Sequence, residues 1–345
     1  MLLMVTNRRP SGSDYGDEEQ SSFRYHYLHD HLNKRPGKDG FSNGGGAKKD
    51  RVEFEAALLA ELIRLRDEEG ISTPKVGLYL HGYNNDWQKS IDELFDLHEA
   101  LTPAIGYEPL LIGFSWPSSG KVQGYLSDRE EVRDSVPAFV RFLIDTNDFL
   151  LRNERKCFST SFCIAHSMGA YLLRKGTEYL SDHLGEPIGR AMFNESVLLA
   201  PDIASKDIEN GGKGSYIADF SRRVHVYYSK YDRALKASST KRFGGNRLGR
   251  HGADDYTNLP PNVVLVNAEQ FANGESVREE KLKDRRKKRI SVHSSQRYHP
   301  EILKDVALAL SSVDRSLIEA RHEVPMTPER PDLPPHHFAL GEKPK

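Results

Sequence analysis

The stretch that most constrains the fold is Phe158–Arg174, which reads FSTSFCIAHSMGAYLLR. Its first half is an apolar run that predicts a buried strand, and its second half has the pattern of a helix. Between them, Ala165, Ser167 and Gly169 form a turn in which small residues flank a serine. A serine on such a sharp strand-to-helix turn is raised from the sheet edge with its hydroxyl exposed. The helix N-terminus favours an oxyanion, so Ser167 is a candidate nucleophile and the Met168 N–H a candidate oxyanion donor. The alternative is a serine N-cap on an ordinary turn.

A nucleophilic serine needs an imidazole to take its proton and a carboxylate to orient that imidazole. Two carboxylates follow predicted strands beyond the serine, Asp202 and Asp232, and the later position favours Asp232. Two histidines, His293 and His299, lie between the last predicted strand and the terminal helix. At this point the pattern leaves both histidines open as the base.

A second turn, His81–Asn84, follows the apolar strand predicted at 76–80. The loop after such a strand supplies the other backbone N–H of an oxyanion hole. Gly82 lets the chain bend close to the serine, and Tyr83 is the expected donor, with Asn84 as its neighbour. The alternative is an ordinary glycine-containing turn. The residues that we expect in the substrate pocket are His81, Gly82, Asn84, Trp116 and His166.

Composition describes a globular chain and excludes several classes of partner. The 345 residues are 37% hydrophobic and 29% charged, with a formal net charge of -1. This charge gives no case for general attraction to nucleic acid or membranes, and no apolar run reaches transmembrane length. Cys157 and Cys163 both fall in the strand predicted before Ser167 and are poorly placed to bridge each other. We therefore expect reduced thiols and a cytoplasmic protein, and the oligomeric state stays open.

Predicted strands alternate with predicted helices, which indicates an α/β fold with a mainly parallel sheet flanked by helices. We expect one domain over 1–322 and a disordered tail over 323–345, which is rich in proline and charge. The domain is expected to contain polar loops at 10–22, 33–50 and 233–260, and a charged insertion at 276–289. The basic run 285–289 is interpreted as solvated, with contact to an anionic substrate or to nucleic acid as the alternative.

No cofactor or metal is expected. His26, His29 and His31 lie close together with Asp30, but nothing downstream completes a metal site at ligand spacing. The glycine clusters at 211–214 and 244–249 do not have the spacing of a phosphate-binding loop.

Seven motifs together resemble the α/β-hydrolase superfamily, in an uncharacterised esterase/lipase-like branch. The motifs are Thr6–Arg8, His81–Asn84, Phe114–Ser118, Ala165–Gly169, Ala200–Asp202, Asp232–Ser238 and Arg247–Gly249. The resemblance implies that Asp232 is the acid and that the base is the histidine some residues before the proline that opens the last helix. His293 fits with Pro300, although Ser295 stands where the family has an aromatic residue, and His299 is the reserve.

The resemblance implies a serine hydrolase that cleaves an ester, or less favourably an amide, through an acyl-enzyme. His293 would deprotonate Ser167, Asp232 would hold His293, and the N–H groups of Tyr83 and Met168 would stabilise the oxyanion. The partner would be a small ester or acyl substrate. The alternatives are an acyltransferase on the same residues and a non-catalytic scaffold whose histidines point away from Ser167.

Overall fold

The computed structural model describes residues 2–12, 14–28, 50–120, 122–157, 160–184, 191–241, 245–283 and 290–342. The described strands form one ten-stranded sheet in the order β2-β1-β4-β3-β5-β6-β7-β8-β10-β9. All neighbouring strands are parallel except the pairs β1–β2 and β10–β9 at the two edges. The mainly parallel sheet confirms the predicted α/β architecture. The strands are β1 (Leu2–Ser11), β2 (Asp14–Leu28), β3 (Lys75–Leu80), β4 (Leu110–Ser115), β5 (Thr160–His166), β6 (Phe193–Leu199), β7 (Ser221–Tyr228), β8 (Val263–Asn267), β9 (Arg321–Glu323) and β10 (His337–Leu340).

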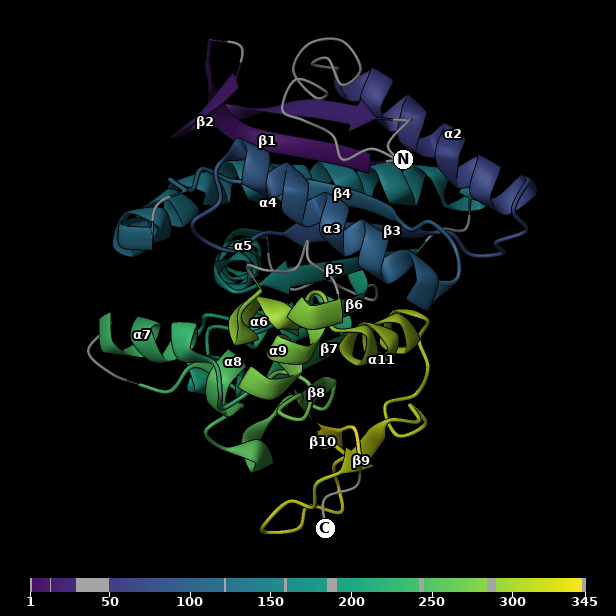
Figure 1. Cartoon of the computed structure of the whole chain (residues 1–345). Coiled ribbons are helices and arrows are strands. Elements are labelled where there is room, and N and C mark those ends of the chain that lie inside the picture. Colours follow the sequence, from purple (N-terminus) through teal and green to yellow (C-terminus); the bar gives the residue numbers. More distant parts are fainter. Residues whose placement is uncertain are drawn as a thin grey trace.

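Helices cover both faces of the sheet (Figure 1). Apolar side chains of α2, α4 and α5 share a buried cluster with one face, and those of α3 and α11 share a second cluster with the other. The central strands are therefore buried on both sides, which explains their continuous apolar runs. The α-helices are α2 (Arg51–Asp67), α3 (Trp87–Ile105), α4 (Tyr125–Cys157), α5 (Met168–Leu184), α6 (Tyr216–Asp219), α7 (Arg233–Lys241), α8 (Leu248–His251), α9 (Gly274–Lys283), α10 (Val292–Ser295) and α11 (Pro300–Leu310).

Residues 10–22, expected to be a polar loop, belong instead to the β1–β2 hairpin. Arg8 pairs with Glu19 and Pro10 pairs with Tyr15, with register shifts between these pairs. The prediction was wrong because this end of the hairpin carries charged and polar side chains that remain largely at the surface. An edge strand of that kind lacks the apolar alternation by which a strand is recognised.

The segment after 323, expected to be a disordered tail, continues into the sheet. Strand β10 pairs with β8 in parallel, and Phe338 and Leu340 are each only 2% exposed. Only four residues form this strand, between a proline-rich stretch and a charged end. Composition averaged over the segment therefore concealed it.

The expected loop at 233–260 contains α7, α8 and the short 3₁₀ helix Tyr256–Asn258. In the charged insertion, 276–283 belongs to α9, whereas 284–289, which holds the basic run, lies outside the described residues. The expected loop at 33–50 lies outside them except for Asp50, which caps α2. Cys163 is buried in β5, but Cys157 ends α4 and does not belong to that strand as predicted.

Candidate active site

Ser167 lies between β5 and α5 in a strained backbone conformation. Its φ angle is 54°, and its N–H donates to the Leu199 carbonyl of the neighbouring strand at 3.0 Å. The helix then passes so close to β3 that a Cβ on Gly169 would lie 2.3 Å from the Leu80 carbonyl oxygen. Glycine is therefore required at this position. The local structure is the sharp turn that the flanking small residues predicted.

His293 lies in α10 and is hydrogen-bonded to Asp232, the residue directly before α7. The His293 Nδ1 and Asp232 Oδ2 atoms are 2.7 Å apart, and the carboxylate side chain is fully buried. Asp232 Oδ1 accepts a second hydrogen bond from the Leu235 N–H at 3.0 Å, which fixes the carboxylate in place. Burial opposes a charged imidazole, but the charge and hydrogen bond of Asp232 outweigh it and raise the pKa of His293.

Ser167 and His293 line the same cleft, which has an empty volume of about 290 Å³. The other residues that line it are Tyr83, Tyr125, Asp202, Ala234, Leu235, Ala237 and Ser238. The cleft lies at the carboxyl ends of the parallel strands, where α/β folds place their sites. The structure therefore brings Ser167, His293 and Asp232 to one place.

The two reserve residues have other partners. Asp202 lines the cleft, but its carboxylate accepts hydrogen bonds from Tyr125 and Ser238. His299 lies at the N-terminus of α11, where its Nδ1 accepts the Glu301 N–H at 3.3 Å, and its ring packs on Phe271.

The loop after β3 packs directly against the serine. A Cβ on Gly82 would lie 3.1 Å from the Ser167 Cβ, so only glycine allows this approach without displacement. Asn84 has a φ of 65° and donates its N–H to Asp128 at 3.1 Å. Since the Asn84 N–H donates to Asp128, Tyr83 stays the predicted oxyanion donor of the two. Met168 is the first residue of α5, where backbone N–H groups have no partner within the helix.

Asp128, on the first turn of α4, fixes this loop and was missed by the sequence analysis. Its two oxygens accept the Asn84 N–H, the Ser119 N–H at 3.0 Å and the Ser118 hydroxyl, so one buried carboxylate joins the loops that follow β3 and β4. The buried Arg8 guanidinium binds the same loops through the carbonyls of Asn85 and Ser118. No sequence pattern distinguishes Asp128 from the other acids of its helix.

Comparison with known proteins agrees with the α/β fold. A family described as "Alpha/beta hydrolase of unknown function (DUF900)" matches residues 59–312, most of the chain. The chain belongs to this family. This α/β-hydrolase is also similar to the uncharacterized protein alr1448 of Nostoc sp. (strain PCC 7120), with 32% identity over 37% of the present chain. The match spans 38% of that relative's length. The description of the family names the α/β-hydrolase class and assigns no function.

Several residues expected in the substrate pocket of this α/β-hydrolase lie behind its wall. His81 stacks on Trp116 with a ring-centroid separation of 5.0 Å, and burial lowers the pKa of His81 to about 3. His166 packs against the His293 ring at 4.9 Å, and burial also lowers its pKa. Neither these three side chains nor Gly82 and Asn84 belong to the described lining. His81, Trp116 and His166 are at most 3% exposed, and contact with a substrate stays a prediction for all five residues.

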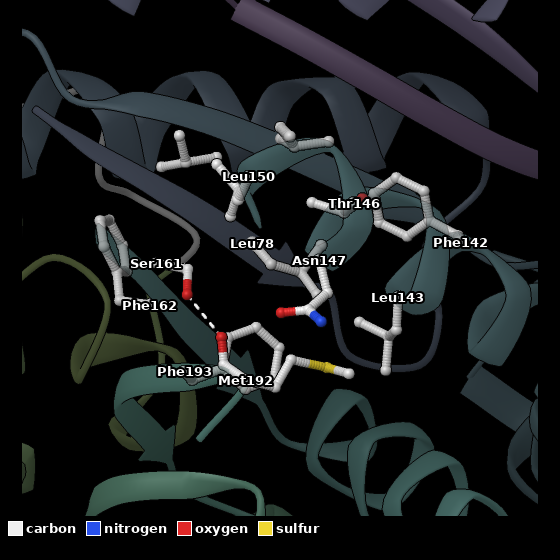
Figure 2. A pocket seen from close by; sticks show the side chains of 12 residues that line it. Leu78, Phe142, Leu143, Thr146, Asn147, Leu150, Ser161, Phe162, Met192 and Phe193 are labelled. Carbon is white, nitrogen blue, oxygen red and sulfur yellow. Dashed lines mark hydrogen bonds between the residues drawn. The ribbon is translucent and has the colours of Figure 1, made fainter. Parts of the chain in front are cut away.

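A second cavity of about 350 Å³ lies at the opposite ends of the strands, between the sheet and α4 (Figure 2). It is lined mainly by apolar side chains such as Leu78, Phe142 and Phe193. The lining includes one serine, Ser161, whose hydroxyl donates to the Met192 carbonyl. Among its described lining residues there is no histidine, cysteine or acid, so this cavity offers no base for the serine.

The part of the chain that the structure describes contains no group of three or more histidine, cysteine or acidic side chains arranged to hold a metal ion. In the histidine cluster considered from the sequence, His26 Nε2 lies within hydrogen-bond distance of the Tyr15 hydroxyl, at 2.8 Å. Residues 29–31 lie outside the described ranges. None of the described helices combines the length and apolar character needed to cross a membrane.

Proposed function

We propose that this protein is a serine hydrolase that cleaves an ester bond through an acyl-enzyme. Ser167 is the nucleophile, His293 the general base and Asp232 the acid that holds His293. The observation that carries the proposal is the 2.7 Å hydrogen bond between His293 and the buried Asp232, beside a cleft that His293 shares with Ser167. A serine alone is a poor nucleophile, and a paired imidazole is the group that activates it.

The hydrogen bond assigns each nitrogen of His293 a part in the reaction. Nδ1 faces Asp232 and carries the proton in the neutral ring, so Nε2 is left to accept the proton of Ser167. The resulting positive charge on the imidazole lies beside a carboxylate, which stabilises it. After the alcohol leaves, the same nitrogen activates water to release the acid.

The oxyanion of the tetrahedral intermediate would be held by the N–H groups of Tyr83 and Met168. Met168 opens α5, so the helix dipole adds to its hydrogen bond, and the Asp128 contact fixes the loop that carries Tyr83. Loss of one such donor costs on the order of a hundredfold or more in rate. The position of His293 on the cleft supports this mechanism over a binding scaffold, for which both histidines would point away from Ser167.

Labelling with a fluorophosphonate probe tests the proposal without knowledge of the substrate. The wild type should be labelled, whereas Ser167→Ala and His293→Ala should not. His299→Ala is the matched control, because it also removes a histidine from the same segment but leaves the cleft intact. Labelling that persists in Ser167→Ala, or that depends on His299 and not on His293, would overturn the assignment.

A further inference from the structure

The cleft contains a buried polar cluster for which the reaction itself has no use. Tyr125, Asp202 and Ser238 all line it and are at most 5% exposed. The Tyr125 hydroxyl donates to Asp202 Oδ2 at 2.8 Å, and the Ser238 hydroxyl donates to Asp202 Oδ1 at 2.7 Å. The two hydroxyl oxygens are 2.8 Å apart. Three polar groups from α4, the β6 end and α7 thus converge in one wall.

The cluster is buried, and an arginine lies next to its carboxylate. The buried Arg247 places its Nε 3.5 Å from Asp202 Oδ1. The Asp202 N–H donates to the Ser167 carbonyl at 3.0 Å, which ties the cluster to the turn that carries the candidate nucleophile. Burial and the Asp202 carboxylate raise the pKa of Tyr125 to about 12, so its hydroxyl stays protonated.

The direction of these hydrogen bonds decides what the cluster offers to a ligand. Both hydroxyl protons are used within the cluster, either on the Asp202 carboxylate, the preferred charged acceptor, or, for one of them, on the other hydroxyl oxygen. What Tyr125 and Ser238 present to the cleft is therefore oxygen lone pairs. An acceptor wall selects a ligand with a hydrogen-bond donor, and an apolar group placed there would leave it desolvated and unpaired.

The charges in and around the cluster favour a ligand whose hydrogen-bond donor is neutral. Because Arg247 already compensates Asp202, an ammonium group would add an uncompensated charge, whereas a hydroxyl would not. The lining also includes two small side chains, Ala234 and Ala237, at exposed positions of α7. The empty volume of about 290 Å³ includes space that is open to solvent, so the enclosed part of the cleft has room only for a small group.

We propose that the Tyr125–Asp202–Ser238 cluster is a specificity site that binds a hydroxyl group of the substrate, so that the preferred substrates are small hydroxylated esters and not alkyl-chain lipids. This inference rests on the proposed serine hydrolase function. It adds the substrate class, which neither the triad geometry nor the family supplies.

Pairs of esters that exchange a hydroxyl for a methyl group test it. One pair, 2-hydroxyethyl acetate and propyl acetate, places the change on the alcohol side. The other, the 4-nitrophenyl esters of hydroxyacetic and propionic acid, places it on the acyl side. In at least one pair, wild-type kcat/KM should favour the hydroxylated ester, after correction for spontaneous hydrolysis, by about three- to tenfold, the effect of one hydrogen bond.

Tyr125→Phe and Ser238→Ala should reduce this preference by lowering kcat/KM more for the hydroxylated ester than for its partner. Ser239→Ala is the matched control, since the Ser239 hydroxyl lies on the same helix but donates to the Gly245 carbonyl outside the cleft. It should retain the wild-type preference. An equal loss for both esters in Tyr125→Phe and Ser238→Ala would indicate a merely structural role and overturn the inference.

The possible failures are distinguishable. A wild type that hydrolyses both members of each pair equally would overturn the specificity site and leave the serine hydrolase intact. A wild type that hydrolyses none of the four esters and is not labelled by the fluorophosphonate would overturn both proposals.

Discussion

Neutralising Asp128 with the substitution Asp128→Asn should slow acylation although Asp128 touches neither the proposed nucleophile nor the base. The carboxylate accepts the Asn84 N–H at 3.1 Å and the Ser119 N–H at 3.0 Å on different oxygens. An amide has one acceptor oxygen, so whichever way it turns, one of these N–H groups faces an NH₂ group. The loop that carries Tyr83 is then held less firmly.

The magnitude follows from the bonds that change. One buried N–H loses its acceptor, at a cost of about 1–3 kcal/mol, and the remaining bonds lose the charge that roughly doubles their strength. We expect the free energy of unfolding to fall by about 2–4 kcal/mol. A complete loss of one oxyanion donor is worth about 3–4 kcal/mol, so a displaced donor should slow labelling about ten- to a hundredfold.

The assay is the second-order rate constant for fluorophosphonate labelling, measured well below the unfolding midpoint of each variant. Asp86→Asn is the matched control: Asp86 lies in the same loop, but its side chain caps α3 by accepting the Lys89 N–H at 2.9 Å. Asparagine caps a helix about as well as aspartate, so this variant should label within twofold of the wild type. A folded Asp128→Asn variant that labels as fast as Asp86→Asn would refute the proposed link between Asp128 and the oxyanion donor.

Three further predictions concern the acid, the turn and the C-terminal strand. In the wild type, kcat/KM should fall as the pH drops through the raised pKa of His293, because the base becomes protonated. Asp232→Asn should move this acidic limb of the pH–rate profile to lower pH. It should also reduce kcat by about 10⁴-fold. An unshifted limb would mean that Asp232 does not act on His293. Gly169→Ala should destabilise the fold by about 3 kcal/mol or more in urea unfolding, because its Cβ would meet a carbonyl at 2.3 Å, whereas Gly274→Ala, with nothing within 4 Å, should not. Phe338→Ala should lower the free energy of unfolding by about 3–5 kcal/mol, since this side chain is 2% exposed, and stability equal to the wild type would show that β10 does not belong to the core.

The sequence predicted those parts of the fold in which local pattern and tertiary role agree. Strands β3 and β5 have apolar central residues because both sheet faces are covered, and each strand is followed by a turn of unusual composition. In a parallel sheet these turns must meet at one edge. That is why His81–Asn84 and Ala165–Gly169, which are far apart in sequence, could be predicted to share a site.

Where the local sequence pattern does not indicate which residues a side chain contacts, the sequence-based prediction was wrong or could not be made. Pro10 and Tyr15 pair across a polar edge hairpin that resembles a loop in composition. The Asp128 carboxylate is buried only because two loops from other strands fold over it. Asp202 and Asp232 both follow strands. Only the structure shows that Asp232 is hydrogen-bonded to His293, whereas Asp202 is hydrogen-bonded to Tyr125.

Backbone strain indicates the same site independently of side-chain chemistry. Within the described ranges, four residues other than glycine have a positive φ, and three of them, Asn84, Ser167 and Ala200, lie after β3, β5 and β6 around the cleft. Each costs of order 1 kcal/mol or more and persists only where its surroundings enforce it. Here the surroundings are visible: Asp128 holds Asn84, the Leu199 carbonyl holds Ser167, and Gln296 Oε1 accepts the Ala200 N–H at 2.8 Å. No propensity could have predicted a left-handed alanine or serine, because the conformation is imposed by neighbouring strands. Strain that is concentrated at three adjacent strand ends, and fixed there by buried hydrogen bonds, is typical of a functional site.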